Sequence, residues 1–172
     1  AQKPVLSDAG AEQVQLQNRV DDLIEAFRLH GHLGADLDPL GRDRRTKAPM
    51  LDPNNFGLTE AHMDRYFHSS GLMAGRAPLR AILEKVRNTY CRRVGVEYWG
   101  LPDAGEREWL RQRMEAVENQ VVPPKDEQIR LLRQLANVDV IDQFLHSKFL
   151  GAKRFSVAGG EAVIALLDQL IE

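Results

Sequence analysis

Apolar residues recur at helical spacing along most of the chain. Between residues 11 and 30 they follow the 3.6-residue period of an amphipathic helix, and a second such stripe begins after Pro78, which suits the first turn of a helix. The first stripe is Val14, Leu16, Val20, Leu23, Ile24 and Phe27; the second is Leu79, Ile82, Leu83, Val86 and Tyr90. The spacing therefore predicts two helices that each bury one face.

The same period predicts further helices in the second half of the chain. Their ranges are 59–67, with Thr59 as the cap, 106–118, 125–136, 139–149, and a last helix that opens at Gly159 or Gly160. The stretch 94–101 is β-branched and aromatic and could be a strand or an extended packing segment, and 153–157 could be a short strand. The predicted fold class is mainly α with one or two short strands.

We treat residues 1–172 as a single helical region. Its parts are a start expected to be flexible (1–10), a helix (11–30), a long irregular segment (31–58), a helical part (59–149) and a closing segment with the last helix (150–172). The irregular segment is rich in Gly, Pro, Asp and Asn. A structureless stretch of that length is usually functional or lies over another surface.

The last helix is apolar over much of its circumference, so it is expected to need cover on more than one side. A native chain that ends at such a helix would be physically unusual. Twelve residues are expected in the core: Leu23, Ile24, Phe27, Leu83, Val86, Trp109, Leu110, Leu132, Phe144, Leu145, Ile164 and Leu167.

Composition narrows the function classes. A net charge of −2 lacks the basic excess of a nucleic-acid binder, so no nucleic-acid partner is expected. No apolar run approaches the roughly 20 residues that cross a bilayer, and residues 1–10 lack the order of a secretion signal. We therefore expect a soluble, intracellular protein without a membrane partner. The single cysteine, Cys91, fits a reducing compartment, as a small buried side chain or, alternatively, a reactive thiol.

Two clusters in the irregular segment are candidate sites. The side chains of His30, His32, Asp36 and Asp38 could ligate a metal, but their spacing matches no known pattern and ordinary turn chemistry accounts for them, so we expect no metal ligands there. Arg42, Arg44, Arg45 and Lys47 could contact an acidic partner or a phosphate; a solvated loop is the simpler interpretation.

A third candidate lies near the last helix. Lys153 and Arg154 supply cations, and the amides of Gly159 and Gly160 precede a helix, where free N–H groups and the macrodipole favour an anion. An arginine suits phosphate because its planar fork donates two parallel hydrogen bonds. The spacing of a phosphate-binding P-loop is absent, as are the common motifs of hydrolases, metalloproteases and dinucleotide-binding enzymes. No catalytic residue is therefore assigned.

Three stretches, at 27–41 ("FRLHGHLGADLDPLG"), 90–115 ("YCRRVGVEYWGLPDAGEREWLRQRME") and 146–171 ("HSKFLGAKRFSVAGGEAVIALLDQLI"), together resemble one family, and "NFGLTEAHMDRYF" (55–67) adds to the likeness. Their order and spacing are similar to the N-terminal region of the thiamine-diphosphate-dependent, decarboxylating first component of 2-oxoglutarate dehydrogenase. The resemblance runs from about Val14 to the end of the chain.

The resemblance implies an enzyme that decarboxylates 2-oxoglutarate on thiamine diphosphate with Mg²⁺ and passes the succinyl group to lipoyl groups, in the tricarboxylic acid cycle. It implies a homodimer, a dihydrolipoyl succinyltransferase partner, and a cytoplasmic location in a bacterium or the mitochondrial matrix in a eukaryote. By resemblance, the arginine of the "KRFS" motif, Arg154, would bind the cofactor. This region would pack on a transketolase-like α/β thiamine-diphosphate domain that the sequence does not contain.

Several features depart from the family pattern. Ala158 replaces an acidic residue before the double glycine, Trp99 and Gly100 replace a Met–His pair, and the family's GDG cofactor motif is absent. The 172-residue chain alone is therefore expected to be inactive. Two alternatives stay open: a standalone helical interaction module derived from that enzyme, and a family member that acts on 2-oxoadipate.

Overall fold

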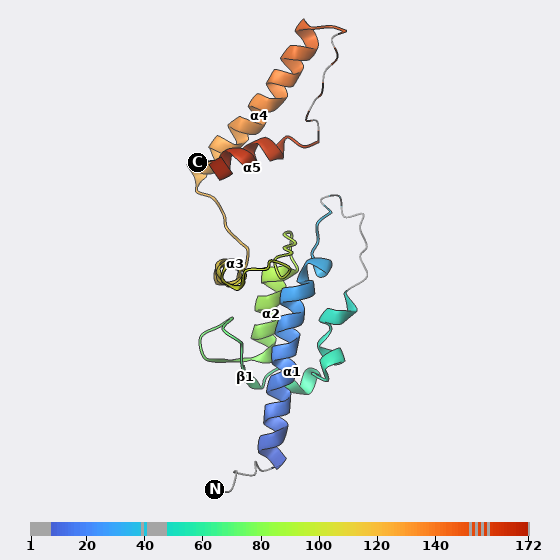
Figure 1. The fold of residues 1–172 in the computed structure, drawn as a ribbon, viewed down its shortest axis with the longest axis vertical. Coiled ribbons are helices and arrows are strands. Elements are labelled where there is room, and N and C mark those ends of the chain that lie inside the picture. The colour runs from blue at the N-terminus through green and yellow to red at the C-terminus, as the bar shows by residue number, and fades with distance from the viewer. Residues whose placement is uncertain are drawn as a thin grey trace. The chain divides into compact units, whose positions relative to one another are not determined.

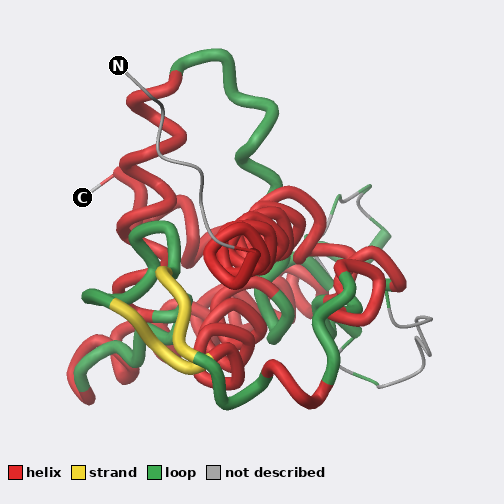
Figure 2. The backbone as a smooth tube through the Cα atoms, turned by 90° about the horizontal axis from the view of Figure 1, so that it is seen from below, coloured by secondary structure: helices red, strands yellow, loops and turns green. Residues whose placement is uncertain are grey.

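The structure is a computed structural model that describes residues 8–38, 40, 48–151, 153, 155, 157 and 159–171 (Figure 1). The chain divides into two units, Ala1–Val121 and Val122–Glu172, each with its own internal contacts. Helices predominate in both, and a short two-stranded sheet lies in the first unit (Figure 2). The mainly α fold predicted from the sequence is confirmed.

Helices α1 (Asp8–His30) and α2 (Leu79–Tyr90) lie side by side and form the core of the first unit (Figure 1). Their predicted apolar stripes supply ten of the 17 residues in the hydrophobic core cluster of the described chain: Leu16, Val20, Leu23, Ile24 and Phe27 on α1, and Leu79, Ile82, Leu83, Val86 and Tyr90 on α2. Each stripe occupies one helix face, so mutual burial removes both from water.

Four short 3₁₀ helices flank this pair: η1 (Gly31–Gly34), η2 (Pro49–Leu51), η3 (Pro53–Phe56) and η4 (Glu60–His62). The first three contact α1, and Leu51 and Leu58 enter the core. Asp52 is the N-cap of η3, and its carboxylate accepts a hydrogen bond from the Asn54 backbone amide at 2.9 Å. The described part of the long segment thus lies over the helical core, which is one of the two alternatives that the sequence left open.

Strands β1 (Tyr66–His68) and β2 (Arg76–Pro78) pair antiparallel, with Phe67 opposite Ala77. The prediction of a helix from Thr59 through Phe67 was wrong beyond His62. Residues 66–68 pair with β2, and Phe67 and Ala77 are buried in the core. Tyr66, His68 and Arg76 beside them are exposed. Cross-strand burial overrides the local helical pattern.

Helix α3 (Ala104–Val117) has Asp103 as its N-cap, and the Asp103 carboxylate accepts a hydrogen bond from the Glu106 backbone amide at 2.9 Å. The expectation that Trp109 lies in the core was wrong, because α3 turns Met114 and Glu115 inward and leaves Trp109 57% exposed. Leu110 packs half-buried against the core cluster. The stretch 94–101 forms no strand and is an extended packing segment that buries Tyr98.

The second unit contains α4 (Lys125–Lys148) and α5 (Ala162–Ile171), which contact each other. Helix α4 is continuous where the sequence predicted two helices, because residues 137–138 include neither glycine nor proline to break it. Among the described residues of this unit, Ala165 is the buried one. No helix in the described ranges has both the length and the apolarity needed to span a bilayer.

Five expected core residues are therefore corrected: Leu132, Phe144, Leu145, Ile164 and Leu167 are exposed, by 66%, 53%, 38%, 40% and 50%. Hydrogen bonds join α4 to α5: Arg130 and Gln134 bind Asp168, and Gln169 binds Glu127. A two-helix hairpin cannot cover apolar residues that point away from its own seam, so these side chains stay exposed.

Candidate functional site

Arg154, the predicted cofactor ligand, lies outside the described residues. Its neighbour Lys153 is described, and the Lys153 ammonium lies 5.6 Å from the centre of the exposed Phe155 ring. This cation–π contact is compatible with a solvated side chain. The structure therefore leaves the assignment of Arg154 as a prediction.

The amides expected to bind an anion before α5 already have partners within the chain. The Gly159 N–H donates to the Glu161 carboxylate at 3.0 Å, and the Gly160 N–H donates to the Val157 carbonyl at 2.7 Å. Hydrogen bonds from the amides of Glu161 itself and of Gly159 lower the pKa of the Glu161 carboxyl. A carboxylate of the chain thus occupies the position in which a bound phosphate was expected.

Within the candidate metal cluster, His32 and Asp36 contact residues from outside the cluster. The Nε2 atom of His32 lies 4.0 Å from the Glu97 carboxylate, and the Asp36 amide donates to the Arg92 carbonyl at 2.7 Å. In the described part of the chain, no three His, Cys, Asp or Glu side chains gather closely enough to hold a metal ion. The basic residues Arg42, Arg44, Arg45 and Lys47 lie outside the described residues.

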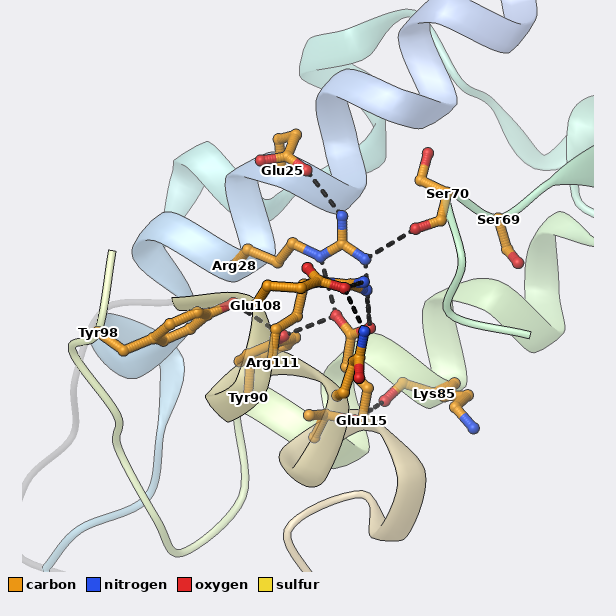
Figure 3. Close-up of polar contacts among 12 residues, drawn as sticks. Glu25, Arg28, Ser69, Ser70, Lys85, Tyr90, Tyr98, Glu108, Arg111 and Glu115 are labelled. Atoms are coloured by element: carbon orange, nitrogen blue, oxygen red, sulfur yellow. Dashed lines mark hydrogen bonds and ion pairs between the residues drawn. The ribbon is translucent and has the colours of Figure 1, made fainter. Parts of the chain in front are cut away.

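The most elaborate polar arrangement is one that the sequence analysis missed: the buried pair Arg28 and Glu115 (Figure 3). The Arg28 guanidinium donates to both Glu115 carboxylate oxygens, from Nε at 2.8 Å and from Nη2 at 3.2 Å. Its Nη1 donates to Glu25 at 2.7 Å, and Nη2 also donates to the Ser70 carbonyl at 3.0 Å. Each of the three guanidinium nitrogens of the buried cation thereby donates at least one hydrogen bond.

Glu115 accepts two further hydrogen bonds, from the Arg111 guanidinium at 2.7 Å and from the Tyr90 hydroxyl at 2.8 Å (Figure 3). The Tyr90 hydroxyl lies 3.2 Å from that of Tyr98. Four donors around one carboxylate use its full acceptor capacity. No lone pair is left for a substrate, so the arrangement crosslinks α1, α2 and α3 and offers no exposed acid or base.

The pKa shifts agree with this role. Burial lowers the pKa of Arg28, but the hydrogen bonds and negative charge of Glu115 outweigh it, and the pKa of Arg28 is raised. Burial is the main cause that raises the pKa of Tyr90, and the neighbouring Tyr98 and Glu115 act in the same direction. Both side chains therefore keep their protons throughout the ordinary pH range.

A signal for this network was present in the sequence. Arg28 follows Ile24 by four residues and so continues the buried stripe of α1 with a charged side chain, and Glu115 directly follows the buried Met114. A charge on a buried helix face requires a partner. Its identity could not be inferred, because Glu115 lies 87 residues away in the sequence.

Cys91 is half-buried at the end of α2, and its thiol donates to the Gly31 carbonyl at 3.4 Å. Burial raises the pKa of the Cys91 thiol to about 11. A thiol that is neutral at physiological pH is a poor nucleophile. The structure thus favours the small buried side chain over the reactive thiol.

The chain is similar to known proteins over nearly all of its length. It is 36% identical over 174 residues to the 2-oxoglutarate dehydrogenase E1 component of Azotobacter vinelandii, and 34% identical over 172 residues to that of Cupriavidus necator, covering 100% and 99% of this chain. It is also 40% identical over 158 residues, 90% of the chain, to the multifunctional 2-oxoglutarate metabolism enzyme of Mycolicibacterium vanbaalenii. No family model matches.

The chain spans only 18% of the length of the first two relatives and 12% of the third. That share fits the expectation that the sequence corresponds to a part of such proteins. At 34–40% identity across nearly the whole chain, the relation cannot rest on one short motif. The chain belongs to the family of 2-oxoglutarate dehydrogenase E1 components, of which it represents a helical region.

Proposed function

We propose that this chain is the N-terminal helical part of a thiamine-diphosphate-dependent 2-oxoglutarate dehydrogenase. Such an enzyme decarboxylates 2-oxoglutarate and transfers the succinyl group to lipoyl groups in the tricarboxylic acid cycle. The proposal is supported by the sequence similarity to dehydrogenase E1 components over the full length of the chain. Its compartment would be the cytoplasm of a bacterium or the mitochondrial matrix of a eukaryote.

The described residues do not by themselves fit thiamine diphosphate with Mg²⁺. They contain no group of three potential metal ligands, and the amides before α5 are bonded to Glu161 and Val157. Arg154 is the residue of this chain that we propose as a contact to the cofactor, because a guanidinium can donate two parallel hydrogen bonds to a phosphate. No step of the reaction is assigned to the other residues.

The second unit supports a packing role for this region. Helices α4 and α5 expose many large apolar side chains, among them Leu132, Leu166 and Leu170 at 66%, 59% and 73%. Water contact with such a surface is unfavourable, and contiguous apolar patches usually mark an interface. We propose that the rest of the enzyme chain covers it, and that the enzyme acts as a homodimer with a dihydrolipoyl succinyltransferase component.

The test uses the longer protein that contains this chain, assayed by 2-oxoglutarate-dependent ferricyanide reduction at varied thiamine diphosphate. Arg154→Ala should raise the cofactor concentration needed for half-maximal activity by about 10-fold, the effect of one lost charge-assisted contact. Lys153→Ala is the matched control and should change it little. Equal behaviour of the two variants would remove Arg154 from the cofactor site.

The substrate is tested by comparing kcat/KM for 2-oxoglutarate and 2-oxoadipate. A clear preference for 2-oxoadipate would replace the proposed substrate with that of the alternative family member. The 172-residue chain alone, supplied with thiamine diphosphate and Mg²⁺, should show no decarboxylation. Measurable turnover by the chain alone would refute its assignment as an incomplete region.

The exposed apolar surface also supports a second candidate, a standalone helical interaction module that binds an intact enzyme subunit. The intact mass of the source protein distinguishes the two. A mass near 19.4 kDa favours the module, whereas a mass several-fold larger favours a part of the full enzyme.

A further inference from the structure

A hollow of about 720 Å³ lies in the first unit between α2 and the 3₁₀ helices η2 and η3. Its volume falls in the range of roughly 300–1,000 Å³ typical of small-molecule sites. Most of its lining is apolar: Phe27, Gly34, Ala48, Pro49, Leu51 and Pro53. The lining therefore suits a ligand with an apolar body.

The polar groups of this hollow differ in their availability. The Asp52 carboxylate accepts from the Asn54 backbone and side-chain amides at 2.9 Å each, and the Asn88 amide donates to Glu118 at 2.9 Å. Arg87 and Arg92 are exposed residues, and neither forms an ion pair with a described residue. Both hydrogen bonds to Asp52 reach the same oxygen and leave its negative charge in place, so Arg87 and Arg92 against Asp52 give the lining a net charge of +1.

A simpler account of Arg87 is its place in the last turn of α2, where the helix dipole stabilises a cation. That interaction uses none of the guanidinium N–H donors, so they remain available to a ligand. An adjoining hollow of about 540 Å³ shares Arg87 but is less suitable. Its other arginine, Arg80, is already paired with Glu60 at 2.6 Å and Asp64 at 3.5 Å.

We propose that the hollow beside α2 binds a small organic anion, a carboxylate or phosphate attached to an apolar body. The anionic group would lie at Arg87 and Arg92, where two guanidinium groups can share it, and the body would lie against Phe27 and Leu51. The site lies within the first unit and is independent of the proposed dehydrogenase function.

Cys91 provides a local reporter, because it lines the hollow and is the one cysteine in the sequence. The rate of Cys91 alkylation by N-ethylmaleimide, followed by intact mass, is measured with increasing octanoate, octyl phosphate or octanol below micelle-forming concentrations. Octanoate or octyl phosphate should slow alkylation to a saturating limit. Octanol, which has the same apolar length without the charge, should need a concentration about 10-fold higher.

The variant Arg87→Gln/Arg92→Gln should abolish the advantage of the anions over octanol. Arg93→Gln is the matched control, since Arg93 is an exposed neighbour that does not line this hollow, and it should retain the advantage. The proposal is overturned if neither anion protects Cys91, if octanol protects equally well, or if the double variant keeps the wild-type preference.

Alkylation of a thiol with a raised pKa is slow, so calorimetric titration with octyl phosphate serves as the second measurement. Heat of binding that disappears in Arg87→Gln/Arg92→Gln and persists in Arg93→Gln supports the site. Heat that is unchanged in the double variant places binding elsewhere, such as on the apolar surface of α4 and α5, and overturns it.

Discussion

The two units differ in which side chains they bury: the first buries apolar residues and one ion pair, whereas the second leaves most of its large apolar residues exposed. In the first unit, α1 and α2 bury their apolar stripes against each other, and the charged pair Arg28 and Glu115 is buried among α1, α2 and α3. In the second unit, the ion pair between Arg130 and Asp168 bridges α4 and α5 with side chains 32% and 45% exposed, while large apolar side chains face outward.

The difference shows which unit can supply its own stability. Burial of apolar surface is the dominant favourable contribution to folding, and the first unit achieves it with its own helices. The α4–α5 hairpin has too little facing surface to do so, and exposed ion pairs contribute roughly 0–1 kcal/mol each. The second unit thus has the composition of a packing element and the first that of a self-sufficient core.

The largest expected effect is the removal of the buried carboxylate. Glu115→Ala leaves the buried Arg28 with only the half-exposed Glu25 as an ion-pair partner and should lower the free energy of unfolding by up to about 3–5 kcal/mol. Urea unfolding followed by tryptophan fluorescence measures this, because Trp99 and Trp109 both lie in the first unit.

The corresponding variant in the second unit is Asp168→Ala, which removes the solvent-accessible ion pair with Arg130. It should lower the free energy of unfolding of that unit by no more than about 1 kcal/mol, which hydrogen exchange measures.

Arg28→Met combined with Glu115→Leu should be less destabilising than Glu115→Ala alone, since it removes both members of the buried charged pair and leaves only the half-exposed Glu25 without Arg28. A double variant as unstable as the single one would show that packing, and not the unpaired charge, dominates at this position.

The next effect compares one leucine from each unit. Leu83→Ala opens a cavity beside α1 and should cost about 2–5 kcal/mol, because Leu83 is only 4% exposed. Leu132→Ala, at a position 66% exposed, should stay within about 0.5 kcal/mol. Hydrogen exchange with peptide resolution reports both. A large cost for Leu132→Ala in the isolated chain would mean that α4 is covered there after all.

A close helix contact gives a smaller effect. A Cβ atom at Gly31 would lie 2.4 Å from the Cβ of Tyr90, so Gly31→Ala must push η1 away from α2 and should cost about 1–3 kcal/mol. Gly100→Ala is the control, since nothing lies within 4 Å of its added Cβ. Thermal unfolding compares the two. Equal midpoints would show that η1 moves at no cost.

The smallest effect is the pH dependence at the edge of the buried network. Hydrogen bonds from Arg111 and then Gln112 lower the pKa of the exposed Glu108 carboxyl from 4.5 to about 2. Because this pKa is lower in the folded state, Glu108 contributes stability above about pH 4.5, and the contribution disappears as the pH falls toward 2.

The difference in unfolding free energy between the wild type and Glu108→Gln should therefore be constant above pH 5 and shrink at lower pH. Urea titrations between pH 3 and 6 measure it. A difference that does not change with pH would mean that the contact with Arg111 is not formed in solution.

The sequence predicted much of the apolar core of the first unit, but it did not reveal the buried ion pair between Arg28 and Glu115. The period of the apolar residues was sufficient for Leu23, Ile24, Phe27, Leu83 and Val86, because a stripe on a helix of adequate length has to be buried. It failed for residues 63–67, where the predicted helix does not form and strand β1 begins at Tyr66. It also failed for the second unit, where apolar periodicity indicated burial that the hairpin does not provide.

The candidate sites also differ in how much of each could be predicted from the sequence. The motif that contains Arg154 was visible in the sequence, and its role stays a prediction because that residue lies outside the described part of the structure. The engagement of Gly159 by Glu161 depends on backbone geometry and could not be inferred from spacing. The rim of the hollow at Arg87 and Arg92 required the packing of η2 beside α2.

By itself, the sequence determined the helical character, the family and the faces of α1 and α2, since these follow from local periodicity and from motifs that keep their order along the chain. The tertiary structure alone decided which charges became buried partners and which apolar residues stayed exposed. Those outcomes depend on contacts such as that between Arg28 and Glu115, and no local pattern encodes a partner 87 residues away.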